Sequence, residues 1–144
     1  MSVPVIKVGA MADTTAGITT EERVVRGVIL AESLRTGTVL DGHGMRIIRV
    51  SRYEVSDAVE YQPSVWTAID FELNEEGAPA LADQLAASLL APGWYVNWNS
   101  DTEATVVFPG QVFRYPHGDA AGRQEAQEHG RRRGVPEPQL DWSD

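Results

Sequence analysis

His117 and Asp119 are the two residues of this sequence best placed to do chemistry, because they stand where an expected strand runs into an expected helix. A helix N-terminus favours anions, since its first N–H groups lack intrahelical partners. Arg114 and Arg123 lie close to them in the sequence, so an anion-binding or acid–base site is one interpretation. The alternative, which we prefer, is that Asp119 caps the helix and His117 is an ordinary loop residue.

Tyr95 and Asp70 are two further candidates for a catalytic role. Tyr95 shares one face of an aromatic strand with two asparagines, so a ring and two amides could line a ligand groove. We prefer the alternative that the aromatic residues of this strand form core. Asp70 lies on the acidic face of a strand with clean period-two alternation. Together with His117 and Asp119, these residues would suit a small cofactor-free enzyme of isomerase or cyclase type, with a pocket between sheet and helix.

Other kinds of chemistry find little support in the residue types. The chain has no Cys, which excludes thiolate nucleophiles, disulfides and Cys-based zinc sites. His43, near Asp41 in a glycine-rich turn, could act as a base, but a polar turn residue is the preferred interpretation. The three His have no metal-ligand spacing, and no nucleophile-elbow or phosphate-loop motif is present. We therefore expect no metal and no cofactor.

The segment from Tyr53 to Phe113 has ten carboxylates and no Lys, Arg or His. A field of one sign attracts basic surfaces and repels nucleic acid, so the segment could bind a basic protein partner. The preferred alternative is a solvated, locally balanced face. In a hairpin of the first two strands, Arg49 would neighbour Asp70, and Arg46 would reach Glu72. The carboxylates left without such a partner form the candidate binding patch: Glu75, Glu76, Asp83, Asp101 and Glu103.

The bulk composition is that of one globular domain. The chain has 144 residues, of which 42% are hydrophobic and 23% charged, at a net charge of −9. We expect a mobile N-terminal arm over residues 1–18 and a single domain over 19–144. No apolar run approaches the length of a membrane span, and the apolar patch near the N-terminus is too broken for a secretory signal. We expect a cytoplasmic protein with no membrane or nucleic-acid partner.

Hydrophobic periodicity predicts three helices and five strands. Apolar residues of segment 19–36 recur with helical spacing, and Thr19 stands three residues before Glu22, as in a capping box. The second helix has a leucine stripe that should pack on a sheet. The expected helices are 19–36, 78–91 and 119–133, and the expected strands are 45–55, 65–73, 94–99, 105–108 and 111–115. The fold class is α+β, in the order α-ββ-α-βββ-α: a mostly antiparallel sheet of about five strands, with helices packed on one face.

The C-terminal segment has two apolar residues, Leu140 and Trp142, after two prolines. We expect them to fold back on the core. The alternative is a short recognition strip for another protein.

Three runs in the second half of the chain resemble small uncharacterised bacterial proteins of actinobacterial type. They are Gly93-Trp94-Tyr95, Val107 to Tyr115, and Gly134 to Trp142. The resemblance implies a bacterial, cytoplasmic origin and a stable fold. It assigns no activity, cofactor or site residue.

These observations favour a non-catalytic acidic protein that recognises a macromolecular partner, in a regulatory, immunity-like or accessory role. The cofactor-free enzyme described above is the alternative. A homodimer formed through sheet edges or helix faces is a third possibility. A buried carboxylate with a raised pKa would favour the enzyme, and an exposed apolar or acidic patch would favour the binding protein.

Overall fold

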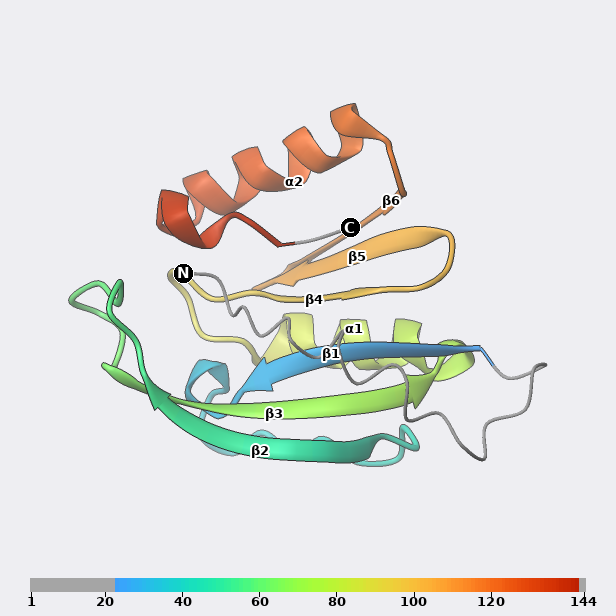
Figure 1. Cartoon of the computed structure of the whole chain (residues 1–144), viewed down its shortest axis with the longest axis horizontal. Coiled ribbons are helices and arrows are strands. Elements are labelled where there is room, and N and C mark those ends of the chain that lie inside the picture. Colours follow the sequence, from blue (N-terminus) through green and yellow to red (C-terminus); the bar gives the residue numbers. More distant parts are fainter. Residues whose placement is uncertain (1–22, 143–144) are drawn as a thin grey trace.

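The computed structural model describes residues 23–142 of the chain (Figure 1). The arm predicted for residues 1–18, and the capping residues Thr19 and Glu22, lie outside this range. The strands are β1 (Val24–Leu30), β2 (Arg46–Glu54), β3 (Val65–Asn74), β4 (Val96–Asn99), β5 (Glu103–Phe108) and β6 (Gln111–Pro116). The helices are α1 (Ala78–Ser88) and α2 (Ala120–Arg132), with 3₁₀ turns η2 (Ala31–Ser33), η3 (Glu75–Gly77) and η4 (Glu137–Gln139).

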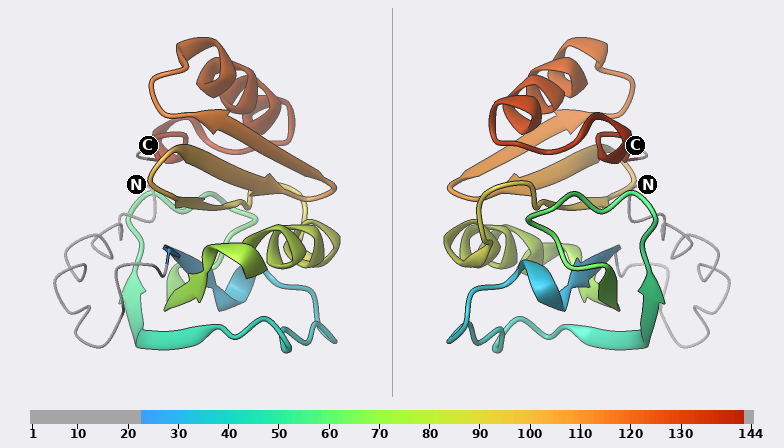
Figure 2. Two further views of the ribbon diagram at one scale, coloured as in Figure 1. Left: turned by 90° about the vertical axis from the view of Figure 1, so that its right-hand side faces the viewer. Right: turned by 90° about the vertical axis from the view of Figure 1, so that its left-hand side faces the viewer.

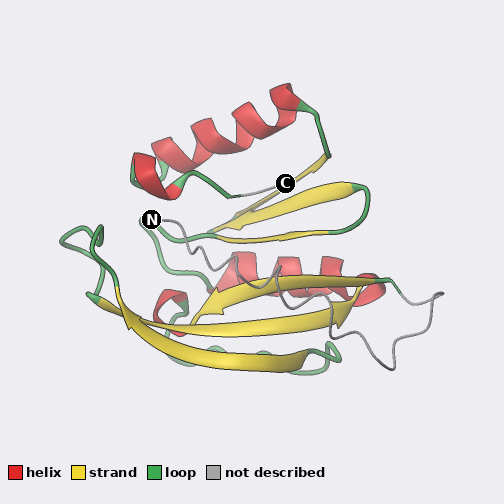
Figure 3. Cartoon of the chain, in the orientation of Figure 1, coloured by secondary structure: helices red, strands yellow, loops and turns green. Residues whose placement is uncertain are grey.

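The six strands form one antiparallel sheet in the order β2-β3-β1-β4-β5-β6 (Figure 3). β1 lies between two groups of strands that are consecutive in the chain. One group is the β2–β3 hairpin and the other is the β4–β5–β6 meander. Both β3 and β4 run antiparallel to β1, so they are parallel to each other, and α1 connects them. The α+β class is therefore confirmed, with six described strands in place of five.

The expected first helix is wrong, because the core of segment 19–36 is strand β1. Its sequence is rich in β-branched residues, and its burial alternates as expected for a strand. Gly27 explains why the strand fits at the centre of the sheet. A Cβ atom at this position would lie 2.9 Å from the ring of Phe71, so only glycine lets the two strands approach.

The leucine stripe of α1 packs on one face of the sheet, as predicted. Leu81 and Leu85 are fully buried, and Pro79 stands in the first turn, where no N–H is lost. The helix packs against side chains from four strands. The main members of this cluster are Val25, Ile29, Phe71, Leu73, Val96, Trp98 and Val107.

Helix α2 lies on the opposite face of the sheet from α1, so the expectation that all helices share one face is wrong. Neighbouring residues of β5 show the division: Val107 packs in the α1 cluster, whereas Phe108 packs in the α2 cluster. Gly130 of α2 lies directly over Phe108. Figure 2 shows α2 and the C-terminal segment over the β4–β6 end of the sheet.

The C-terminal segment folds back on the core, as expected. Leu140 and Trp142 are buried among the α2 cluster. The indole N–H of Trp142 donates to Tyr115 Oη at 2.8 Å, and the guanidinium of Arg123 lies over the Trp142 ring. A third cluster, which contains Trp66 and Trp94, lies at the other end of the sheet face that α2 covers.

Candidate functional site

His117 and Asp119 are both engaged in local structure. Asp119 Oδ1 accepts the N–H of Gly122 at 3.0 Å, which makes Asp119 the N-cap of α2. His117 Nε2 lies 2.8 Å from the carbonyl oxygen of Ser100, and its backbone N–H donates to Thr102. Arg123 turns away to bond the carbonyl of Trp142. The loop holds the β4–β5 turn against the start of α2.

Tyr95 lies in the core beneath the C-terminal segment. Its hydroxyl donates to the carbonyl of Gln139, and its ring packs against Phe108 and Trp142. Burial raises the pKa of this phenol far above its ordinary range, so the neutral form persists. Such a hydroxyl anchors η4 to the sheet. Within residues 23–142, no hydrogen bond or ion pair joins any two of Tyr95, Asp70, His117 and Asp119.

Asp70 belongs to an ion-pair network on the face of the sheet that α2 also covers. Arg49 Nε lies 3.2 Å from Asp70 Oδ2, and Arg26 lies 2.7 Å from Glu72, which also pairs with Arg46. The two carboxylates are buried, whereas Arg46 and Arg49 are half exposed. The cross-strand pairs Arg49–Asp70 and Arg46–Glu72 confirm the hairpin register predicted from the sequence.

Burial shifts the pKa values of two residues at this network, Asp70 and Tyr53. Desolvation raises the pKa of Asp70, and the charge and hydrogen bond of Arg49 oppose that shift. The hydroxyl of Tyr53 is buried and has no hydrogen-bond partner among the described residues. Its pKa is raised by burial first, then by the negative charges of Asp70 and Glu32. Asp70 is therefore the carboxylate among the catalytic candidates whose pKa burial raises, as expected of a general acid or base.

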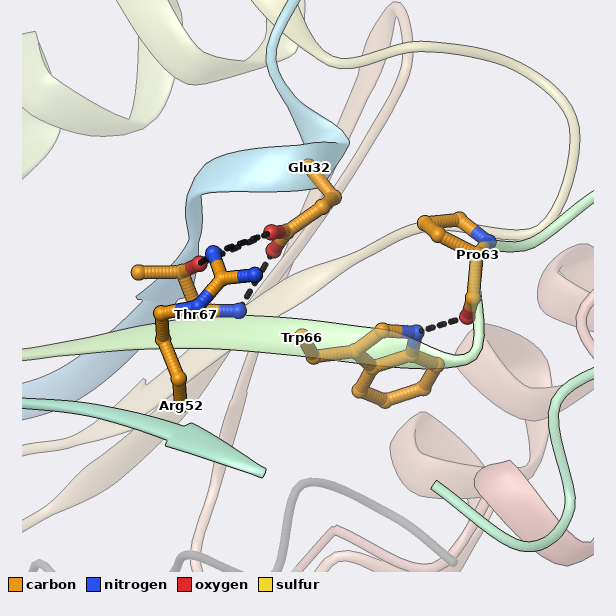
Figure 4. A network of polar contacts seen from close by, with 5 residues as sticks. All are labelled: Glu32, Arg52, Pro63, Trp66 and Thr67. Atoms are coloured by element: carbon orange, nitrogen blue, oxygen red, sulfur yellow. Dashed lines mark hydrogen bonds and ion pairs between the residues drawn. The ribbon is translucent and has the colours of Figure 1, made fainter. Parts of the chain in front are cut away.

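A second polar network ties the end of β1 to the β2–β3 hairpin (Figure 4). Glu32 accepts the backbone N–H and the hydroxyl of Thr67, at 2.6 and 2.8 Å. Arg52 donates to the same hydroxyl at 2.6 Å and lies 3.9 Å from Glu32. The carboxylate of Glu32 thus satisfies the ladder N–H of β3 just beyond the last residue of β1. Sequence reasoning missed this role because it placed Glu32 in a helix.

The outer strand β2 exposes an aliphatic strip that the sequence did not reveal. Ile47, Val50 and Ile48 are 62%, 58% and 38% exposed. β2 is the last strand of the sheet on this side, and β3 is its only neighbour among the described strands. The ladder is irregular between Ile47 and Arg49, where one extra residue is accommodated. We call the exposed side of residues 46–54 the β2 edge.

The carboxylates of the candidate binding patch gather mainly at one end of the sheet. Glu75 and Glu76 follow β3, and Asp101 and Glu103 stand at the β4–β5 turn. Since Val24 pairs with Asn74 and Arg26 with Asn99, both positions lie beside the start of β1 (Figure 1). Asp83 is exposed on α1. Over the described range, none of the five forms an ion pair.

Comparison of the chain with protein-family models, with curated proteins and with solved structures returned no match. In the part of the chain that the structure describes, no three His, Asp or Glu converge as metal ligands. None of its helices is long and apolar enough to cross a bilayer.

Proposed function

We propose that this chain is a non-catalytic protein that recognises a protein partner, in a regulatory, immunity-like or accessory role. The observation that carries the proposal is the β2 edge. It combines a long outer strand with three aliphatic side chains that are more than one third exposed. Natural sheets often protect an outer strand with charged residues and bulges, and β2 has both. It nevertheless exposes aliphatic side chains beside backbone groups that no described strand pairs with, an arrangement that invites another chain.

The acidic patch supplies a second, longer-range element of recognition. Its carboxylates form no ion pair with described residues, so their field extends into solvent and would favour a partner with a basic region. Such a field accelerates association more than it tightens the complex. It would therefore make capture of the partner sensitive to salt.

Affinity capture with the full chain tests the proposal. The bait is wild type, the double variant Ile47→Lys/Val50→Lys, or the control Val39→Lys, in which an equally exposed aliphatic residue outside β2 is changed. We expect wild type and control to retain one partner from the producing cell at low salt, and the double variant to lose it. A wild-type bait that retains no salt-sensitive partner contradicts the proposal.

A second candidate function, the cofactor-free enzyme, is favoured by one observation. Asp70 is buried and its pKa is raised, and its negative charge in turn adds to the effect of burial in raising the pKa of the Tyr53 hydroxyl. A catalytic Asp70 would hold its proton to higher pH than an ordinary carboxyl group. Turnover of a metabolite mixture that disappears in both Asp70→Asn and Tyr53→Phe, with the fold intact, would establish the enzyme over the binding protein.

A further inference from the structure

The β2 edge has two chemically different faces. Strand alternation places Arg46 and Arg49 on the face that carries the buried carboxylates of β3, and Ile47 and Val50 on the other face. Ile48 occupies the irregular position between them. Arg52 pairs with Thr67 and therefore lies on the same face as Val50. Over residues 46–50, a strand that paired with β2 would present its own side chains alternately to a basic face and to an aliphatic face.

The arginines of the β2 edge are held in place from within the sheet. Arg46 pairs with Glu72, Arg49 with Asp70, and Arg52 donates to Thr67. Their side chains remain 53%, 49% and 64% exposed, whereas the carboxylates of Glu72 and Asp70 are 6% and 1% exposed. The positive ends of these pairs therefore face solvent. Guanidinium groups fixed in this way lose little side-chain entropy when they bind a further carboxylate.

A second copy of this chain fits the edge poorly. The β2 strand of a second copy would offer the arginines of the edge three arginines and one carboxylate, Glu54, in place of a row of carboxylates. Like charges that face each other across a ladder are destabilising.

We propose that β2 is the docking strand for an extended segment of a partner protein in which acidic side chains, next to Arg46 and Arg49, alternate with aliphatic ones, next to Ile47 and Val50. The inference rests on the proposed function and names the chemistry of the partner. Main-chain hydrogen bonds to the side of β2 that no described strand pairs with supply affinity, and the two faces of β2 supply specificity. Repulsion between the acidic segment and the net charge of −9 on this chain is screened beyond about 10 Å at ordinary salt, so the contacts at the β2 edge decide the affinity.

Three blocked peptides, each as long as β2, test the inference on the full chain. All have Val at alternate positions, and the remaining positions are all Glu, all Gln or all Lys. Fluorescence anisotropy measures affinity, and amide shifts in ¹⁵N spectra locate the binding site. We expect the Glu peptide to bind at residues 46–54, and the Gln and Lys peptides to bind at least about tenfold more weakly.

Two variants separate the two faces. Arg46→Gln leaves Glu72 paired with Arg26, so the fold is kept while affinity for the Glu peptide falls and its preference over Gln shrinks. Val50→Lys should weaken both the Glu and the Gln peptide, and Val39→Lys should weaken neither. Circular dichroism and the melting temperature of each variant establish that it is folded.

The inference is overturned if the Glu peptide fails to bind, binds away from residues 46–54, or binds no better than the Lys peptide. Concentration-dependent dimerisation in sedimentation experiments, abolished by Val50→Lys, would assign the edge to a second copy and also overturn it. A captured partner that survives Ile47→Lys/Val50→Lys would leave the binding function standing and remove β2 from it. Peptide binding at β2 with no captured partner would keep β2 as a docking strand and would contradict the proposed function.

Discussion

Arg49 and Asp70 face each other across the β2–β3 ladder, with Nε of the arginine 3.2 Å from Oδ2 of the carboxylate. The pair joins a half-exposed cation to a carboxylate that is 1% exposed. The arginine therefore stabilises a buried charge and at the same time presents its remaining N–H groups at the β2 edge. Arg49 therefore links the stability of the sheet to the proposed docking surface.

Removing that cation should destabilise the fold. In Arg49→Met, Asp70 keeps its burial but loses its ion-pair partner, and we expect the free energy of unfolding at pH 7 to fall by about 1–2 kcal/mol. Urea unfolding of wild type, Arg49→Met, Asp70→Asn and the double variant measures the coupling. Equal stabilities of wild type and Arg49→Met would show that the pair contributes nothing.

Gly27→Ala should disturb the centre of the sheet. The added methyl group would lie 2.9 Å from the Phe71 ring, so the ring or the strand must move, at a cost of about 1–3 kcal/mol. Calorimetric melting measures the loss. Phe71→Leu removes the ring edge, and Gly27→Ala should then cost clearly less in that background. A cost that is unchanged by Phe71→Leu would contradict the packing described for β1.

The C-terminal segment should be part of the cooperative core. Trp142 is 1% exposed, so Trp142→Ala should cost about 3–5 kcal/mol through lost burial and the cavity left behind. Tyr115→Phe removes the acceptor of the indole N–H and should cost about 1 kcal/mol. Guanidinium unfolding followed by tryptophan fluorescence measures both. A Trp142→Ala protein as stable as wild type would mean that the segment packs loosely.

His129 should make stability depend on pH. Burial lowers its pKa below the ordinary value of 6.5, and Arg133 and Arg132 lower it further. The folded state therefore binds the proton more weakly than the unfolded chain. Stability should fall as the pH drops below about 6.5 and should be fully present above it.

Comparison of wild type with His129→Gln isolates this contribution. The difference in unfolding free energy between pH 7.5 and pH 5 should be smaller in His129→Gln, because the shifted group is gone. Identical pH dependence in the two proteins would show that His129 is not the responsible group.

The sequence predicted local pairings well and non-local placement poorly. Arg49–Asp70 followed from hairpin register, since both strands are adjacent in the chain and alternate cleanly. The apolar residues of segment 24–30 fit a helical period, whereas its β-branched residues and the central Gly27 favour a strand in close contact with another. Whether an apolar residue of β2 is core or surface depends on the order of strands in the sheet, which no local pattern contains. Ile47 and Val50 were therefore taken as ordinary strand residues.

The candidate catalytic residues likewise divide into those with local contacts and those with contacts between distant parts of the chain. The capping role of Asp119 was predictable from its position before a helix, because capping is a local interaction. The contact of Tyr95 with Gln139 was not predictable, because it joins residues 44 positions apart. The burial of Asp70 likewise depends on what the folded chain brings over the sheet.

We propose above that this protein recognises its partner through β2. Hydrogen–deuterium exchange of the full chain, with and without the partner recovered by affinity capture, measures that contact. We expect new protection of the amides of residues 46–54, and no such gain in Ile47→Lys/Val50→Lys. Protection confined to other elements, with residues 46–54 exchanging as in the free chain, would contradict it.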